Sequence, residues 1–171
     1  MKMPSEVIRE EILRNRVISF ERFMELALYC PETGYYETEK NIVGRGGDFI
    51  TSVSTGSLFG ELLAFQFAGW LGEFKIKNEK LKIVEAGAHD GKLAADILNW
   101  LQLHRPQLFA QLEYCILEPS ETRRRWQKET LAAFGNKVHW HAHVSELKNP
   151  QPATGILFGN ELLDAFPVRR F

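Results

Sequence analysis

The sequence predicts an α/β domain that is built on a parallel sheet and follows an N-terminal helical segment. The short run at residues 82–84 ends in Glu85 and a glycine turn, and an amphipathic helical pattern follows directly. A second apolar run over residues 114–117 also ends in an acid, Glu118. Strand, tight loop, helix and second strand in this order are typical of the first unit of a doubly wound fold.

Size and composition are those of one ordinary globular domain. The chain has 171 residues, of which 44% are hydrophobic and 25% charged. A net charge of -1 argues against general nucleic-acid binding, and the basic run at residues 123–125 is predicted to be a solvated helix face. The longest apolar stretch, residues 62–71, is interrupted by Gln66, so it predicts a core helix and no membrane contact. The absence of an apolar signal core and of metal-spaced cysteines predicts a cytoplasmic location.

The first 75 residues are predicted to form the helical segment. Ser5 and Ser19 are candidate N-caps of two helices. A glycine-rich loop follows at residues 44–49, where glycines allow the backbone to approach a ligand closely. We therefore expect a helical segment with this loop over residues 1–75 and a sheet domain over residues 76–171.

Two further strands are predicted, at residues 138–140 and 156–158. The second of these is expected to be buried on both faces, with its outer edge unpaired. Asn160 and Glu161 follow it directly. Since ligands of such sheets bind beyond the carboxyl ends of the strands, these two residues are functional candidates beside Glu85 and Glu118.

The loop after the first strand indicates which cofactor the edge could bind. A carboxylate at Glu118 is placed to accept hydrogen bonds from both hydroxyls of a ribose, which indicates an adenosine-containing ligand. A dinucleotide site would need glycine where His89 stands, and a P-loop would need a hydroxyl where Leu93 stands. S-adenosylmethionine carries no phosphate, and Glu85 suits its ammonium group. The alternative is a glycine turn in an α/β domain without a cofactor.

Five motifs in order resemble one known family. They read ISFERFMELALYCPETGYY, GRGGDFITS, LFGELLA, VEAGAHDGKLAADIL and GNELLDAFPVRRF. From about Ile18 to Phe171 the chain is similar to MidA-type proteins, class I S-adenosylmethionine-dependent methyltransferases linked to assembly of respiratory complex I. The resemblance implies a Rossmann-like sheet in strand order 3-2-1-4, the first four strands of a longer class I sheet. The chain would then be an N-terminal part or a shortened relative of the family.

The resemblance also implies methylation of a protein, at arginine, and a set of site residues. Implied for the cofactor are Glu85, Gly87 and Glu118, and we add Gly91 of the same turn and Gly46 and Gly47 of the glycine-rich loop. Glu161 would orient the guanidinium and favour loss of its proton, with Asn160 in support and Asp48 as a second candidate. The chain departs from the family pattern at His89, which replaces a glycine, and at residues 51–54, which replace a Thr-x-Pro-Glu run.

Two other functional classes stay open. A binding or scaffold module would keep the adenosine site without turnover. A metalloenzyme is the other class, because His139, His141 and His143 alternate and would share one face of a strand, although no acid or cysteine is spaced to complete a site. In either case the outer edge of the fourth strand, or the tail at residues 167–171, is expected to promote self-association.

Overall fold

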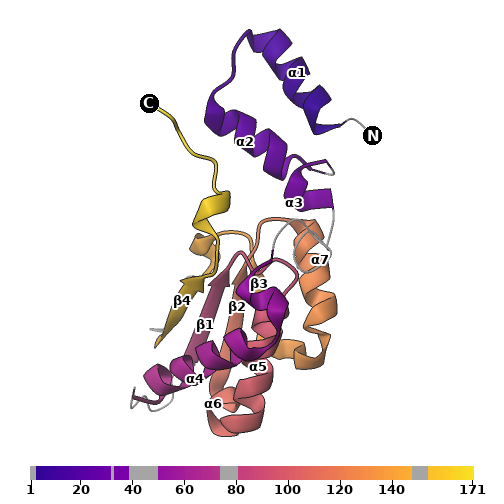
Figure 1. Ribbon diagram of the computed structural model, residues 1–171. Coiled ribbons are helices and arrows are strands. Elements are labelled where there is room, and N and C mark those ends of the chain that lie inside the picture. The colour runs from indigo at the N-terminus through magenta and orange to yellow at the C-terminus, as the bar shows by residue number, and fades with distance from the viewer. Residues whose placement is uncertain (1–2, 32, 39–49, 74–80, 148–153) are drawn as a thin grey trace. The chain divides into compact units, whose positions relative to one another are not determined.

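The computed structural model describes residues 3–31, 33–38, 50–73, 81–147 and 154–171 (Figure 1). The chain forms two compact units. The first consists of Met1–Asp48 and Glu161–Phe171, and the second of Phe49–Asn160. The boundary expected between residues 75 and 76 falls inside the second unit, because the helix before it packs with the sheet.

The first unit begins with three helices: α1 (Pro4–Asn15), α2 (Phe20–Tyr29) and α3 (Tyr35–Thr38). Ser19 caps α2 as predicted, its hydroxyl accepting a hydrogen bond from the Arg22 N–H at 3.1 Å. The prediction for Ser5 is wrong, since α1 already starts at Pro4 with Met3 as its N-cap. Proline favours the first helical position because its ring presets φ and it has no N–H to satisfy.

The returning segment of the chain, residues 161–171, lies against α2 and completes the first unit. It contains one short 3-10 turn, η4 (Leu163–Ala165). The Tyr29 hydroxyl donates to the backbone oxygen of Ala165 at 2.7 Å, and Arg169 Nε donates to Glu21 at 2.7 Å. The tail is therefore tied to α2 by both a backbone contact and an ion pair.

The second unit holds a four-stranded sheet whose strands are β1 (Leu81–Ala86), β2 (Leu112–Leu117), β3 (Val138–His141) and β4 (Thr154–Gly159). Their order is β3-β2-β1-β4 and every pair is parallel. All four strands and their order are as predicted.

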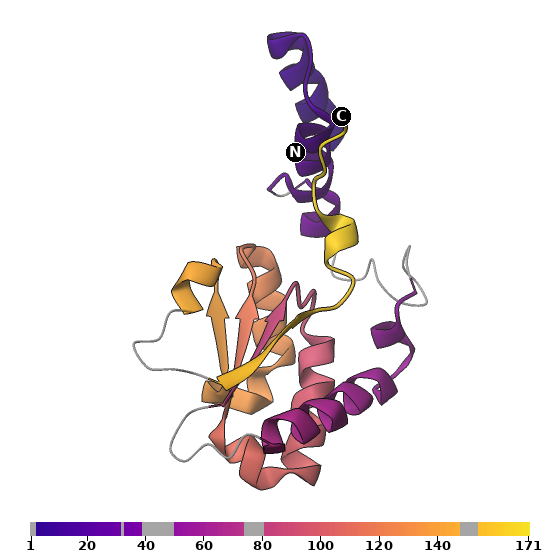
Figure 2. The ribbon, with the colours of Figure 1, turned by 90° about the vertical axis from the view of Figure 1, so that its left-hand side faces the viewer.

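Helices of this unit cover one face of the sheet. They are α4 (Leu58–Glu73), α5 (Lys92–His104), α6 (Pro106–Gln111) and α7 (Glu121–Thr130), with the 3-10 turns η1 (Ser52–Thr55), η2 (Ala132–Lys137) and η3 (Val144–Leu147). Figure 2 shows α4 and α5 on the same side of the strands. A single core joins Ile83 and Tyr114 of the sheet to Ile97 of α5 and Phe67 of α4.

The opposite face of the sheet is less covered, and this corrects the expectation for the fourth strand. Burial alternates along β4, and the side chain of Leu157 is 65% exposed. Leu157 and Val84 lie side by side in the register of β4 and β1, on the face away from the helices. The strand is therefore buried on one face only, because no described helix packs on the other.

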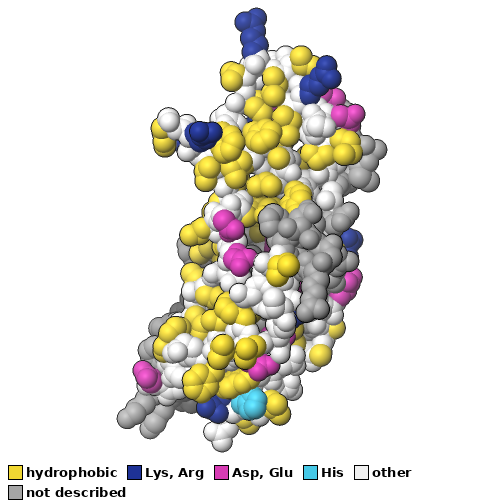
Figure 3. Space-filling view, in the orientation of Figure 1, with side chains coloured by type: hydrophobic (Ala, Val, Ile, Leu, Met, Phe, Trp, Pro, Cys, Tyr) yellow, Lys and Arg dark blue, Asp and Glu magenta, His cyan; other side chains and the backbone are white. Residues whose placement is uncertain are grey.

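α4 buries one side and exposes the other. Figure 3 shows hydrophobic side chains gathered over this helix, and the exposed ones are Leu58, Leu62, Phe65 and Trp70. The stretch at residues 62–71 is thus a helix whose core-facing side is buried, as predicted, and whose outer side is apolar as well. Within the described ranges, no helix combines the length and the apolarity that crossing a membrane requires.

Two glycines of α4 predict opposite effects of the same substitution. A Cβ at Gly60 would lie 2.5 Å from the Cβ of Asp96 on α5, whereas a Cβ at Gly69 meets nothing within 4 Å. We expect Gly60→Ala to lower the free energy of unfolding by about 1–3 kcal/mol, because the helices must separate. Gly69→Ala should raise it by about 0.5–1 kcal/mol through helix propensity. Urea unfolding measures both changes in the free energy of unfolding. Changes of the same sign in the two variants would contradict the packing of α4 on α5.

Candidate functional site

The loop between β1 and α5 is held in an uncommon backbone conformation. Gly87, His89 and Gly91 have φ values of 74°, 47° and 85°, all in the left-handed region. Glycine adopts this region freely, but a residue with a Cβ pays roughly 1–2 kcal/mol for it. His89 therefore needs its surroundings to hold it there.

This loop presents backbone donors at the start of α5. The Gly87 N–H donates to Leu117 at 3.3 Å, and the Gly91 N–H donates to Ala88 at 2.7 Å. The N–H groups of Ala88 and His89 donate to no residue in the part of the chain that the structure describes. Such donors at a helix N-terminus suit a carboxylate or another anionic group.

Glu85 lies in the core rather than at the rim of the sheet. Its side chain is 2% exposed, and Oε2 accepts a hydrogen bond from the Tyr114 hydroxyl at 2.7 Å. Burial raises the pKa of the Glu85 carboxyl to about 7; the hydrogen bond from Tyr114 opposes this rise, and the charge of Asp90 adds to it. The carboxyl group is thus available to a ligand only from within the core, and its contact with the cofactor stays a prediction.

Glu118 follows β2 directly and is 1% exposed. Its Oε1 accepts from the Ser120 N–H and from Arg123 Nη2, both at 3.0 Å, and its Oε2 accepts from Gln127 Nε2 at 3.3 Å. A carboxylate offers about four acceptor positions, so these contacts leave about one for another donor. The sequence predicts that this carboxylate accepts from both hydroxyls of a ribose, and that contact stays a prediction.

Arg123 and Gln127 were missed as site residues by the sequence reasoning. Arg123 was assigned to a solvated face, yet it is 9% exposed and pairs with Glu118. Together with Trp126, these residues stand at i, i+3 and i+4 on one side of α7, the period that marks a buried helix face.

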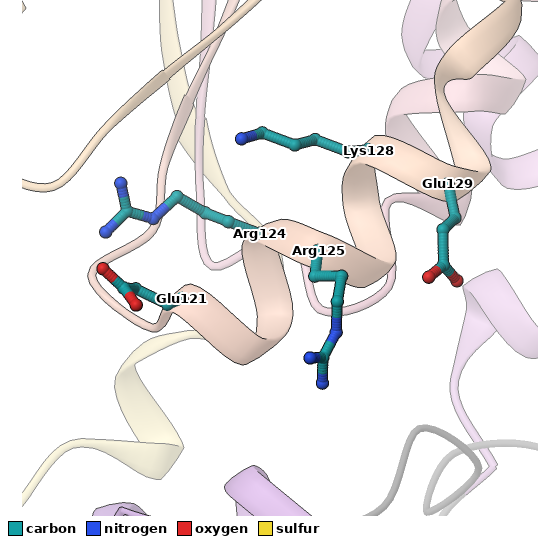
Figure 4. A pocket seen from close by; sticks show the side chains of 5 residues that line it. All are labelled: Glu121, Arg124, Arg125, Lys128 and Glu129. Carbon is teal, nitrogen blue, oxygen red and sulfur yellow. The ribbon is translucent and has the colours of Figure 1, made fainter.

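Figure 4 shows the charged side chains that line the shallow pocket on α7: Glu121, Arg124, Arg125, Lys128 and Glu129.

The predicted catalytic residues are only partly brought to this edge. Asn160 comes directly after β4, at the same edge of the sheet as Glu118, and is half-buried. Glu161 is exposed, has a left-handed φ of 49°, and opens the segment that belongs to the first unit. Asp48, Gly46 and Gly47 lie outside the described residues, so their roles stay predictions.

The histidines of β3 do not form a metal centre with other described residues. His139 and His141 belong to β3, and His143 follows it. His141 Nδ1 lies 3.9 Å from Glu146 Oε2. Over residues 81–147 and the other described ranges, no group of three or more His, Cys, Asp or Glu could hold a metal ion. The metalloenzyme alternative gains no support from this geometry.

Comparison with known proteins gives consistent matches. The sequence profile of a family described as "Putative S-adenosyl-L-methionine-dependent methyltransferase" matches residues 62–171. The chain is 28% identical over 184 residues to the mitochondrial protein arginine methyltransferase NDUFAF7 homolog of Drosophila melanogaster, covering 95% of this chain and 40% of that protein. The chain is 38% identical over 180 residues to the mitochondrial protein arginine methyltransferase NDUFAF7 of Bos taurus. This match covers 90% of this chain and 38% of that protein.

A solved structure of a related protein agrees with these sequence matches. A crystal structure of a Burkholderia thailandensis protein bound to S-adenosyl-homocysteine is 34% identical, with a TM-score of 0.76, over 96% of this chain and 42% of that one. The chain spans about two fifths of the length of the curated relatives it matches. Those relatives are named as mitochondrial proteins, so the cytoplasmic location predicted from the sequence stays a prediction.

The profile match covers well over half of the chain and includes the loop after β1, the end of β2 and all four strands. The strand order and the motifs that resemble MidA-type proteins agree with it. This chain therefore belongs to that family of S-adenosyl-L-methionine-dependent methyltransferases, whose cofactor is S-adenosyl-L-methionine.

Proposed function

We propose that this chain takes part in methyl transfer from S-adenosyl-L-methionine to an arginine side chain of a protein. The observation that carries the proposal is the buried Glu118 carboxylate, whose described contacts leave about one acceptor position, beside a loop in which the N–H groups of Ala88 and His89 meet no described acceptor. A ribose hydroxyl can donate to the Glu118 carboxylate, and the carboxylate of the cofactor's amino-acid end can accept from the N–H groups of the loop. The relatives' names as protein arginine methyltransferases support the protein substrate.

In this proposal the first two strand ends hold the cofactor. Gly87 and Gly91 let the backbone approach its amino-acid end, Glu118 binds the ribose, and Glu85 acts on the ammonium group. Gly46 and Gly47 of the glycine-rich loop are proposed as further cofactor contacts. When bound, the cofactor supplies a sulfonium methyl group, and the task of the chain is to position and desolvate the acceptor nitrogen.

Three residues are proposed for the substrate. The Glu161 carboxylate would orient the guanidinium and favour loss of a proton from the attacking nitrogen, with the Asn160 amide in support. The left-handed backbone of Glu161 supports a functional role, because strained residues concentrate at sites where the strain is useful. Asp48 is the second candidate for the carboxylate.

Calorimetry with S-adenosyl-homocysteine tests the cofactor site. We expect the wild-type chain to bind, and Glu118→Ala to weaken binding by about 1.5–3 kcal/mol, or roughly 10- to 150-fold, the scale of hydrogen bonds to a charged group. Glu113→Ala is the matched control, since Glu113 lies on β2, the strand that Glu118 follows, and its carboxylate pairs with Lys82 at 3.7 Å. Unchanged affinity in Glu118→Ala would remove the ribose assignment.

A second measurement tests whether this chain alone transfers the methyl group. Methyl transfer is followed with labelled cofactor and protein acceptors, and the products are analysed for methylated arginine. Since the chain spans about two fifths of its relatives, we expect binding with little or no turnover by this chain alone. NADH binding of comparable strength would contradict the proposal and indicate an oxidoreductase.

A further inference from the structure

We propose that Gln127 is a positioning residue that holds both halves of the cofactor site, the loop after β1 and the carboxylate after β2, in one arrangement. This inference rests on the proposed function. Gln127 is 0% exposed and stands on α7, one helical turn after Arg123. None of the motifs that carry the family resemblance contains it.

The side-chain amide of Gln127 contacts three separate parts of the fold. Its Nε2 donates to the backbone oxygen of His89 at 2.9 Å and to Glu118 Oε2 at 3.3 Å. Its Oε1 accepts from Trp140 Nε1 of β3 at 3.0 Å. One buried amide therefore links the first loop, the end of the second strand and the third strand.

Trp140 determines which way this amide points. An indole N–H can only donate, so the amide oxygen must face it and the NH₂ group must face the other way. Both amide hydrogens are then directed at acceptors, the backbone oxygen of His89 and the carboxylate of Glu118. One donor partner and two acceptor partners thus fix the orientation of the Gln127 amide.

The loop depends on this contact because His89 is not glycine. Its left-handed φ of 47° is unfavourable for a residue with a Cβ, and the hydrogen bond to its carbonyl fixes the following peptide. α7 also packs closely on the loop: a Cβ added at Gly91 would lie 3.3 Å from Gln127 Cα. The arrangement leaves the N–H groups of Ala88 and His89 facing no described acceptor.

The Gln127→Leu variant tests the proposal, since leucine has a similar shape and neither donates nor accepts. We expect its affinity for S-adenosyl-homocysteine to fall about tenfold or more, the effect of losing hydrogen bonds to a carboxylate and to the loop. Gln102→Leu is the matched control, because Gln102 is exposed on α5. Trp140→Phe removes the indole donor and part of the ring, leaves both donor contacts of the Gln127 amide, and should cause a smaller loss.

Amide hydrogen exchange without ligand separates positioning from general stability. In Gln127→Leu, exchange should accelerate at Gly91, whose N–H donates to the backbone oxygen of Ala88, and stay unchanged in β1. Equal acceleration throughout the sheet, or wild-type affinity together with wild-type exchange in the loop, would overturn the proposal. A wild-type chain that binds no S-adenosyl-homocysteine, while its loop still responds to Gln127→Leu, would refute the proposed function and keep the positioning of the loop.

Discussion

Replacing Glu85 with glutamine is expected to remove most of the change in stability that the protein shows between about pH 4.5 and about pH 7. The pKa of this carboxyl is raised from 4.5 to about 7 in the folded chain. Within this window the folded state keeps a proton that the unfolded state has released, so stability falls as the pH rises. The full difference corresponds to about 3 kcal/mol, present below about pH 4.5 and lost above about pH 7.

The Glu85→Gln variant keeps an oxygen that accepts from the Tyr114 hydroxyl and carries no charge. Denaturant unfolding over a pH series should show it more stable than the wild type by about 3 kcal/mol above about pH 7 and nearly equal near about pH 4.5. Glu121→Gln, which changes an exposed carboxylate on α7, should follow the wild-type profile. If the stability of the Glu85→Gln variant falls with rising pH as much as that of the wild type, another group causes the fall.

Self-association through the outer edge of β4 is the second large effect we expect. β4 pairs with β1 on one side, and among the described strands it has no partner on the other. The N–H and C=O groups of an edge strand recruit further strands, and the 65% exposed Leu157 adds apolar surface. The tail is the weaker candidate, because Arg169 already pairs with Glu21. We propose that a second copy of the chain joins at β4.

Light scattering over a series from micromolar to near-millimolar concentration measures this. The wild-type mass should rise with concentration, and Leu157→Lys should keep the chain monomeric, because a charge at an edge opposes strand pairing. Leu62→Lys is the control, since it places the same charge on the exposed outer side of α4. If only the α4 variant becomes monomeric, the chain associates through that helix; a wild type that stays monomeric throughout removes the proposal.

The strands could be predicted because their signals are local, whereas their order follows from the resemblance to MidA-type proteins. Each strand is a short apolar run, and the sequence places an acid at the end of two of them; Glu118 follows β2 directly, whereas Glu85 lies inside β1 and is buried. The cap at Ser19 is local in the same sense, because the hydroxyl and the N–H it accepts from are three residues apart. A helix or strand period contains this information without reference to the rest of the chain.

The environment of the two carboxylates could not be predicted, because it depends on distant neighbours. Tyr114 reaches Glu85 only because β1 and β2 pair in a register that sets Ile83 beside Tyr114. The partners of Glu118 come from the buried side of α7, where the helical period could have identified Arg123 and Gln127 had the arginine run not been assigned to solvent. The exposure of Leu157 depends on what covers the sheet, and the strand's own residues do not encode it.

The segment that returns to α2 has a consequence for the order in which the chain folds. The hydrogen bond from Tyr29 to Ala165 spans 136 positions, and the pair of Arg169 with Glu21 spans 148. Closing so long a loop in an unfolded chain is entropically unfavourable and slow, and prior folding of the intervening residues shortens it. Docking of the tail should therefore be a late step, and Glu161, at the head of that segment, acquires its final backbone conformation only when this step is complete.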